Sequence, residues 1–468
     1  MLRILANPLF ALGILLAAMP FVGGYAESPH NFNRLLQLFV LCCGSVVWAR
    51  LAWSGPSEGW HFHSIAVAVL ILGGAISCGV ADVPIVAFRE WALILGSGVL
   101  VLVISRCAFW RDASQQLAFI KLLLLGGFLH ACSFFVLLLS VLLRGDELRP
   151  WDLVMGFDNP RLLNHVQVLL IPILVGSIAR LKELGALTRL WSLLSWFAIG
   201  GQFCIVAVTF GRSAGVALAI AAVVARILFG RQVDSFLRGL LKGVAVGALL
   251  YVLFMCVGPR VAGAAAGGQT EPVEVFSDHS RIFLWREAFA HFSKSPFWGV
   301  GPMHLAHFPN RAGAHPHNIY IQMIAEWGIF CGLVAIVLLL SVMWRAARVI
   351  HKRDEGCFPM AVFVACAGAL VDGLFSGNFV MPNSQLWLAL SFGLLLNITR
   401  EPYAMGLRMA APQLVWRVVL VSIVVVQGWF FIQSWGEFKG SQTTMLGVTP
   451  PPNIGSLDRP RFWRKGWF

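Results

Sequence analysis

Two arginines of this chain stand where helices are predicted to begin. Arg161 follows Asn159 and Pro160, which fit an N-cap and a first-turn proline, and Arg212 lies in GRSAG (211–215) at the start of an apolar run. Free N–H groups and the helix dipole draw anions to such positions, and a guanidinium group binds phosphate in bidentate fashion. Either arginine, taken alone, would also suit a side chain that snorkels to a membrane interface.

A polar stretch, 258–317, holds more side chains of this kind. It contains six of the twelve histidines: His279, His291, His304, His307, His315 and His317. It also contains five cations: Arg260, Arg281, Arg286, Lys294 and Arg311. A loop that is simply exposed to solvent is the plainer interpretation, but acid–base and anion-binding chemistry use these same residues.

A helix is predicted over about 279–293, with Ser277 or Asp278 as its cap. One face of it would carry residues at amphipathic spacing: Arg281, Trp285, Ala288, Phe289 and Phe292. We therefore expect this helix to lie against the membrane face of the protein, with Arg281 in its first turn.

The segment HPHNIYIQMIAEWG (315–328) leads into the next apolar run. Pro316 suits the first position of a helix, on which His317 would share a face with apolar residues. An adjacent polar stripe would consist of Asn318, Gln322 and Glu326. Polar side chains that enter a membrane span are costly and usually functional, although a hydrogen-bonded packing stripe is the alternative.

Metal chemistry has little support in the sequence. His304, His307, His315 and His317 have enough ring nitrogens for zinc, but the two pairs flank a PNRAGA stretch and no CxxC or HExxH motif accompanies them. No DxD motif offers carboxylates to Mg²⁺. We therefore expect no metal ion and no cofactor. If the site stabilises a diphosphate leaving group, arginines would do so directly.

The elements that position these residues are predicted to be membrane helices. The chain has 468 residues, of which 58% are apolar and 12% charged, and its mean hydropathy is +0.77. Soluble domains are about 45–50% apolar and about 25% charged, so this composition excludes soluble, disordered and fibrous proteins. Because lipid does not tolerate unpaired backbone groups and no ten-residue alternation occurs, we expect an all-α integral membrane protein with about 12 (12 or 13) transmembrane helices.

The chain divides into four predicted parts. They are nine spans in 1–257, the loop 258–317, further spans in 318–433 and a basic tail, 434–468. Basic residues in alternate short loops number thirteen against six, which places the N-terminus in the cytoplasm and the loop outside. The basic tail then argues for the cytoplasm, whereas a thirteenth span would place it outside. On this orientation the helix-start arginines, Arg281 and His317 all lie on the outer face.

In this order and spacing the motifs resemble the O-antigen ligase and polymerase superfamily. The shared features are GRSAG, S-x-x-S-R-x-x-x-W-R-x-A (277–288), P-F-W-G-V-G (296–301) and H-N-x-Y-x-Q-x-x-x-E-x-G (317–328). The resemblance implies a fold like that of GT-C-type polytopic glycosyltransferases. It also implies a glycan donor on undecaprenyl pyrophosphate, used at the periplasmic face of the Gram-negative inner membrane. A ligase would transfer this glycan to a sugar of lipid A–core and complete lipopolysaccharide.

The resemblance also assigns residues, and one mechanism follows. The family's loop histidine matches His317, with His315 as a near alternative, and its two arginines match Arg212 and Arg281. Arg161, Arg212 and Arg281 would bind the pyrophosphate, while His317 takes the proton of the acceptor hydroxyl in a direct, inverting, metal-independent displacement. We expect nearby arginines to lower the pKa of His317 and keep it neutral. Four more residues would add substrate contacts: Arg286, Asn318, Gln322 and Glu326.

Other functions remain open. An O-antigen polymerase uses the same donor with an undecaprenyl-linked acceptor, and a protein O-oligosaccharyltransferase would attach the glycan to protein. A transporter or flippase of an anionic lipid-linked substrate would also use arginines, but here they collect at one face rather than along a path. Membrane lipids are expected partners. Nucleic acid is not, because the net charge of +13 comes from residues in short turns between apolar runs.

Overall fold

A computed structural model of the chain describes most of its length: residues 7–24, 26–53, 62–107, 109–146, 149, 153–258, 278–308, 310, 312–400, 413–439, 460–464 and 468. These residues form helices joined by turns, and none of them lies in a β-strand. The expectation of an all-α protein is therefore confirmed for the part of the chain that is described.

The helices follow one another with mostly short connections. In chain order they are α2 (Pro8–Gly23), α3 (Pro29–Ala52), α4 (Phe62–Gly79), α5 (Pro84–Arg106), α6 (Ala113–Arg144), α7 (Pro160–Glu183), α8 (Arg189–Val208), α9 (Arg212–Phe229), α10 (Asp234–Tyr251), α12 (Asp278–Phe292), α13 (Ile319–Arg353), α14 (Cys357–Asp372), α15 (Pro382–Ile398) and α16 (Gln413–Lys439). The predicted polar loop thus contains α12 and ends where α13 begins.

Eight helical segments within the described ranges are long and apolar enough to cross a membrane. Three shorter helices are also apolar: Pro8–Gly23, Ile65–Gly79 and Cys357–Asp372. This content is that of an integral membrane protein whose chain crosses the bilayer several times. The number of 12 or 13 spans stays a prediction.

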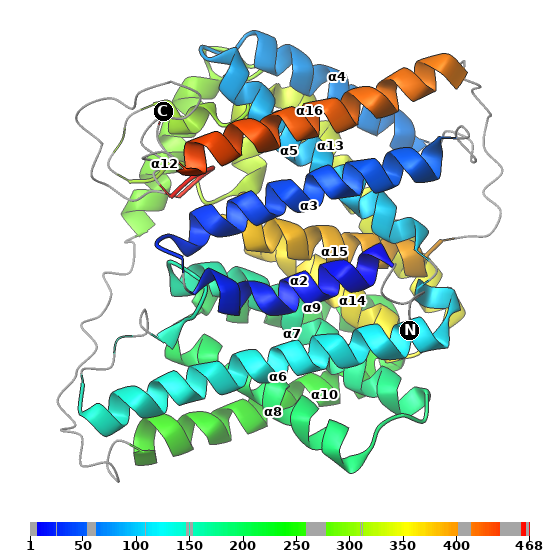
Figure 1. Ribbon diagram of the computed structural model, residues 1–468, viewed down its shortest axis with the longest axis vertical. Helices are drawn as coiled ribbons and strands as arrows, with labels where there is room; N and C mark the ends of the chain where they lie inside the picture. The colour runs from blue at the N-terminus through cyan, green and yellow to red at the C-terminus, as the bar shows by residue number, and fades with distance from the viewer. Residues whose placement is uncertain are drawn as a thin grey trace.

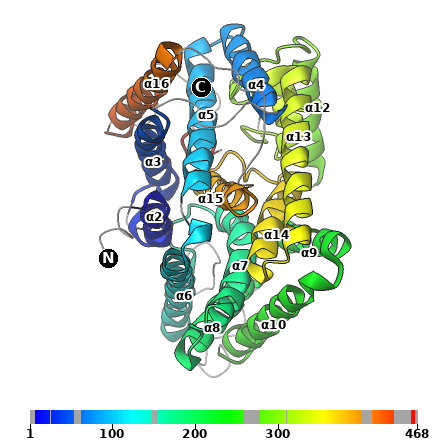
Figure 2. The ribbon, with the colours of Figure 1, turned by 90° about the vertical axis from the view of Figure 1, so that its right-hand side faces the viewer.

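Three helices, α7, α14 and α15, form the centre of the bundle (Figure 2). Nearly all of their side chains are buried. α7 and α14 approach each other closely because small residues meet, with Gly176 against Ala361 and Gly368 against Val168. Close contact through small residues is the usual way in which membrane helices pack. α7 is therefore held closely against α14 in the middle of the bundle.

One end of the bundle gathers the segments that carry the predicted site, and we call it the loop end (left in Figure 1). Trp285 of α12 donates a hydrogen bond to the carbonyl oxygen of Pro316 (3.0 Å), which precedes α13. The N–H group of Ile319 donates to the carbonyl oxygen of Gly373 (2.9 Å), which follows α14. These bonds fix α12, the start of α13 and the end of α14 to one another.

The PFWGVG motif (296–301) packs against a break in α13. Gly328 has φ 81° and ψ 168°, so the helix is interrupted there. The N–H group of Gly301 donates to the carbonyl oxygen of Glu326 (2.9 Å). A Cβ atom at Gly328 would collide with the backbone of Phe297, so this position requires glycine. The motif and the final glycine of the 317–328 pattern are therefore two halves of one contact.

The start of α13 differs from the prediction. The helix begins at Ile319 and not at Pro316, because the backbone of His317 is left-handed (φ 52°) and cannot join a right-handed helix. Asn318 is the N-cap instead, and its side-chain oxygen accepts from the N–H groups of Tyr320 and Ile321 (3.0 Å each). His317 therefore precedes the helix, and its predicted place on an apolar helical face is wrong.

The packed face of α12 also differs from the prediction. Leu284 and Ala288 are buried, whereas Phe289 is 51% exposed. The physical reason is that Ala288 packs against Leu305 and Ala325, which turns the neighbouring Phe289 outward. The predicted cap Ser277 lies outside the described residues.

The end of the chain returns to the loop end. Arg461 is buried and forms ion pairs with Glu326 of α13 (2.7 Å) and Glu90 of α5 (3.6 Å). Arg34 of α3 donates to the backbone oxygen of Arg461 (2.8 Å). Residues 460–464 thus lie at the same end as the loop, as a thirteenth span predicts. The count of basic residues predicts the opposite end. It fails here because it applies to solvated charges, and the charge of Arg461 is neutralised inside the protein.

Candidate functional site

The first turns of α7 form the centre of the candidate site. Asn159 caps the helix as predicted, since its side-chain oxygen accepts from the N–H group of Arg161 (2.8 Å), and Pro160 takes the first position. Arg161, Asn164 and His165 are three and four residues apart, so they share one face of the helix. That face meets the turn before α9 and the end of α14.

Arg281 of α12 approaches Arg161, although the two are far apart in sequence. Both side chains are partly buried, and their guanidinium groups lie close enough to repel each other. Two cations that the fold holds together repel each other, and an anion between them lowers that repulsion. The anion site at Arg161 and Arg281 stays a prediction, with which their proximity agrees.

Arg212 begins α9 beside the same face of α7. The hydroxyl group of Thr209 donates to the side-chain oxygen of Asn164 (3.0 Å), and a Cβ atom at Gly211 would lie 2.8 Å from the Asn164 amide. This contact places the start of α9 about one helical turn from Arg161. The side chain of Arg212 itself is exposed. We call Arg161, Arg212 and Arg281 the arginine cluster.

The two predicted histidines lie together at the loop end. The ring centroids of His315 and His317 are 4.1 Å apart, and the backbone N–H group of His317 donates to Nδ1 of His315 (3.3 Å). His315 is buried, whereas His317 is partly exposed. Burial first, and then the charges of His317, Arg461 and His165, hold the pKa of His315 well below its ordinary value. His315 is thus a neutral imidazole, and His317 is the one that substrate can reach.

Backbone strain occurs at two places in this region. His317 and Phe210 both have positive φ values, 52° and 50°, although neither is a glycine. A left-handed conformation in a non-glycine residue costs about 1–3 kcal/mol and is common where a side chain must be held in a fixed direction for function. Phe210 is two residues before Arg212, so both strained positions adjoin predicted site residues.

A buried carboxylate–histidine pair extends the site, and the sequence analysis missed it. Nδ1 of His165 lies 3.1 Å from the Oδ2 atom of Asp372, which also accepts from the hydroxyl group of Ser376 (2.7 Å). His165 is close enough to His315 for its charge to act there. Two signals could have found this pair. His165 is four residues after Arg161, and Asp372 is an acidic residue inside an apolar run, which is costly in lipid.

The predicted polar stripe has partners inside the protein. Asn318 caps α13 and also donates to the carbonyl oxygen of Leu374 (3.1 Å). Gln322 donates to Glu326 (3.2 Å), whose carboxylate is paired with Arg461. These contacts match the hydrogen-bonded alternative for the stripe. Arg286 is exposed on α12. The structure brings together Arg161, Arg281, His315 and His317. The stripe residues and Arg286 lie at the margin of this group.

His304 and His307 are engaged in packing. Nε2 of His304 accepts from the N–H group of Val83 (3.0 Å), so its Nδ1 donates to the carbonyl oxygen of Pro302 (2.9 Å). His307 bonds through Nδ1 to the backbone oxygen of Phe468 (2.9 Å). Both nitrogens of His304 are therefore used, which argues against the zinc alternative. Within the described ranges, no three His, Cys, Asp or Glu side chains gather as a metal site would require.

The arrangement can do two kinds of chemistry. Cations on separate helices can neutralise the charge that develops on a diphosphate leaving group. A partly exposed imidazole beside them can take a proton from a hydroxyl group that attacks the bond to that leaving group. Together these functions describe transfer of a group from a diphosphate carrier to an alcohol.

The fold thus defines a multi-pass membrane protein. Residues 196–337 match the model of the O-antigen ligase family, whose members are glycosyltransferase-like enzymes. The matched region contains Arg212, Arg281, His315 and His317, whereas Arg161 lies before it. No curated protein matches the chain.

Proposed function

We propose that the chain is an O-antigen ligase. It transfers a glycan from undecaprenyl pyrophosphate to a sugar of lipid A–core at the periplasmic face of the inner membrane. The observation that carries the proposal is the convergence of Arg161 and Arg281 from separate helices, with His165, one turn after Arg161, near the paired histidines. A lipid-linked diphosphate sugar already has a good leaving group. Charge neutralisation and placement of the acceptor hydroxyl are then the main tasks of the enzyme.

The proposed roles follow the positions of the side chains. The arginine cluster binds the pyrophosphate, and His317, the more exposed histidine, takes the proton of the acceptor hydroxyl. His315 remains neutral and accepts from the backbone of His317, so it supports the strained conformation of that residue. Direct attack from the side opposite the leaving group inverts the anomeric centre.

The pair of His165 and Asp372 has a positioning role in this proposal. A carboxylate that accepts from Nδ1 fixes the ring orientation of a histidine. His165 lies one turn from Arg161, so its bond to Asp372 holds this face of α7 against the end of α14. His165 thus supports binding of the diphosphate by Arg161 without touching the acceptor.

An assay with purified protein in lipid nanodiscs tests the proposal. Undecaprenyl-pyrophosphate glycan and lipid A–core are supplied together, and lipopolysaccharide is measured by gel mobility and mass spectrometry. We expect glycosylated lipid A–core with inverted anomeric configuration, in the presence or absence of EDTA. Loss of activity with EDTA and recovery with Zn²⁺ or Mg²⁺ would contradict the metal-independent mechanism.

A deletion strain distinguishes the ligase from its relatives. Loss of glycan from lipid A–core, with long chains still carried on undecaprenyl, is the outcome for a ligase. Single repeats attached to lipid A–core would indicate a polymerase, and loss of glycan from a protein would indicate a protein glycosyltransferase. Movement of the donor lipid across vesicles without any transfer would favour a flippase.

A further inference from the structure

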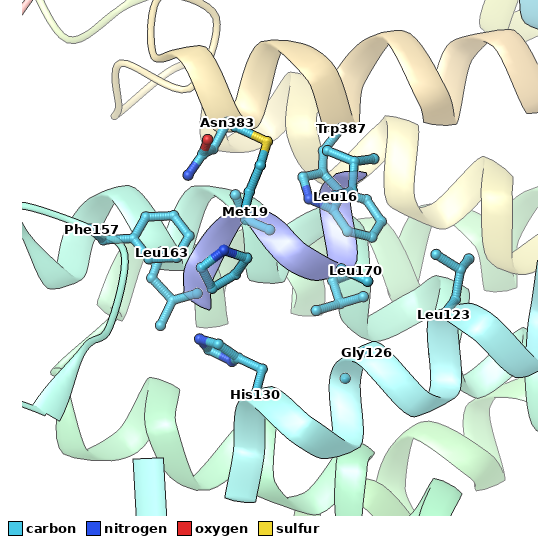
Figure 3. Close-up of a pocket in the computed structure, with 14 residues that line it drawn as sticks. Leu16, Met19, Leu123, Gly126, His130, Phe157, Leu163, Leu170, Asn383 and Trp387 are labelled. Atoms are coloured by element: carbon cyan, nitrogen blue, oxygen red, sulfur yellow. The ribbon is translucent and has the colours of Figure 1, made fainter. Parts of the chain in front are cut away.

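A cavity inside the bundle, between α2, α6, α7 and α15, is too small for a lipid. Its wall is mainly apolar and includes Leu16, Leu170 and Trp387 (Figure 3). It encloses about 40 Å³, which is room for water and far below the range of about 300–1,000 Å³ that is usual for ligand sites. Lipid therefore meets these helices on their outer faces.

The outer face of α13 carries an apolar stripe whose members are three or four residues apart: Leu333, Val337, Leu340 and Trp344. This spacing puts them on one side of the helix, and they are between 48% and 60% exposed. At 1.5 Å per residue the stripe is about 16 Å long, which is close to the hydrocarbon thickness of one membrane leaflet. The stripe therefore offers a continuous surface for one acyl chain.

Exposed cations follow the stripe where α13 ends, far from the loop end. Arg348 and Lys352 continue the same side of the helix, one and two turns after Trp344. The guanidinium group of Arg348 lies over the ring of Trp344, 5.1 Å from its centroid. Tryptophan is enriched where a helix leaves the hydrocarbon core. The face thus changes from apolar to aromatic to cationic, in the order in which a phospholipid changes from acyl chain to head group.

The turn between α9 and α10 brings further cations to this end of α13. Nε2 of Gln232 donates to the carbonyl oxygen of His351 (3.3 Å), and the exposed Arg231 directly precedes Gln232. Arg238 of α10 is also exposed and is close enough to Cys357, at the start of α14, for its charge to act there. We call the four exposed cations the basic patch: Arg231, Arg238, Arg348 and Lys352.

The acidic residues near the basic patch are mostly engaged elsewhere. Asp234 pairs with Arg226 (2.9 Å), and Glu355 accepts from the indole N–H group of Trp110 (2.6 Å). Asp354 is exposed at the end of α13 and is a single charge against four. In the part of the chain that the structure describes, no cation of the basic patch forms an ion pair. The patch therefore keeps an excess of positive charge for an anion from outside.

We propose that this face of the protein binds an anionic phospholipid. Its acyl chain lies along the stripe of α13, and the phosphate of its head group contacts the basic patch. Basic pockets between membrane helices bind anionic head groups, and each cation near an anionic lipid strengthens binding about fivefold. The apolar stripe beside the cations favours a lipid over free phosphate, which would use the cations alone. The site uses none of the residues assigned to transfer, so its test needs no measurement of transfer.

Native mass spectrometry of the full-length protein in detergent tests the proposal. Phosphatidylglycerol and phosphatidylcholine with identical acyl chains differ in the net charge of their head groups. We expect the first molecule of phosphatidylglycerol to bind at least about tenfold more tightly than phosphatidylcholine. Equal affinities would overturn the proposal. Inorganic phosphate at the same concentration should not displace the lipid, and displacement by it would identify a site for free phosphate instead.

Matched variants show whether the binding is local. Arg348→Gln/Lys352→Gln removes two cations of the basic patch, so binding of phosphatidylglycerol should weaken at least about tenfold, with binding of phosphatidylcholine unchanged. Arg50→Gln/Arg417→Gln is the control, because it removes two cations from the same end of the bundle on α3 and α16, across from α13 (Figure 2). Equal losses in the two variants would show a diffuse attraction and contradict the proposal. Thermal unfolding of each variant shows whether it is folded.

Photolabelling places the acyl chain. A phosphatidylglycerol that carries a diazirine in one acyl chain is added to the full-length protein in phosphatidylcholine nanodiscs, and mass spectrometry locates the label. We expect labelled peptides from the stripe of α13, which unlabelled phosphatidylglycerol protects and additional phosphatidylcholine does not. Label that is protected on other helices but not on α13 would overturn the assignment.

Discussion

Two groups of charged residues at the loop end are arranged in opposite ways. In the first, which we call the paired cluster, cations meet carboxylates or backbone oxygens: Arg34, Arg89, Glu90, Glu326, Glu437 and Arg461. In the arginine cluster, one cation, Arg281, stands beside another, Arg161. The first group pairs opposite charges, whereas the second brings like charges together. The sign of the neighbouring charge, and not burial alone, therefore distinguishes the two groups.

The comparison assigns different roles to the two clusters. The paired cluster joins α3, α5, α13, α16 and the 460–464 segment, so it stabilises the packing of these segments at the loop end. The arginine cluster and the two histidines are positioned by this packing. A change in the first should affect folding, and a change in the second should affect transfer while the fold remains.

The largest effect is expected for His317→Ala. Removal of a general base commonly lowers the rate by about 10²–10⁴-fold. Transfer in nanodiscs should fall by that factor, while the unfolding temperature stays near that of the wild type. Activity like that of the wild type would move the base to His315 or remove the need for one.

Arg461→Met should act on stability. Removal of one partner from a buried ion pair costs about 3–5 kcal/mol, because Glu326 is left charged without a cation. Thermal or denaturant unfolding in detergent measures the loss. The double variant Arg461→Met/Glu326→Gln should recover part of it. A stable but inactive Arg461→Met protein would break the comparison, since it would place the paired cluster in the reaction.

The loop histidine His304 should give the protein a pH-dependent stability. Burial lowers the pKa of His304 to about 4 from its ordinary value of 6.5, so the folded protein keeps the ring neutral. The unfolded chain binds a proton below pH 6.5, so the stability contribution is complete above that pH and is lost as the pH falls toward 4. The loss is about 1.4 kcal/mol per pH unit. His304→Gln should flatten this dependence in unfolding experiments between pH 7 and pH 4.5, and an unchanged slope would contradict the assignment.

Arg281→Lys is expected to have the smallest of these effects. Lysine keeps the charge but loses the two-pronged geometry that matches a phosphate, so transfer should fall about tenfold. Arg238→Lys, an exposed change on α10 away from the loop end, is the control and should leave transfer unchanged. Equal rates for Arg281→Lys and the wild type would reduce the role of Arg281 to bulk electrostatics.

Some of the site was predictable because it depends on local sequence. Asn159 and Pro160 determine where α7 begins, so the place of Arg161 at a helix start follows from neighbouring residues alone. The strained turn at His317 was not predicted, since a proline after His315 suits a helix start as well as a turn. The left-handed backbone of His317 and the N-cap at Asn318 show which of the two occurs.

The remaining part depends on contacts between distant segments. The partner of Glu326 could not be found from the sequence, because the pairing depends on where residues 460–464 lie after α16. The charge pattern even suggested the opposite end for that segment. His165 and Asp372 could each have been singled out in the sequence, because each is a polar residue in an apolar run. Nothing in the local sequence indicates that their side chains meet.

The ion pair between Arg461 and Glu326 also constrains how the protein is made. A ribosome completes α5 and α13 before it adds Arg461, so Glu90 and Glu326 enter the membrane region before their cation exists. Their carboxylates must find other polar partners, such as water, during insertion, and the loop end reaches its final form only after translation has passed α16. The region around the proposed site is therefore completed after the helices have entered the membrane.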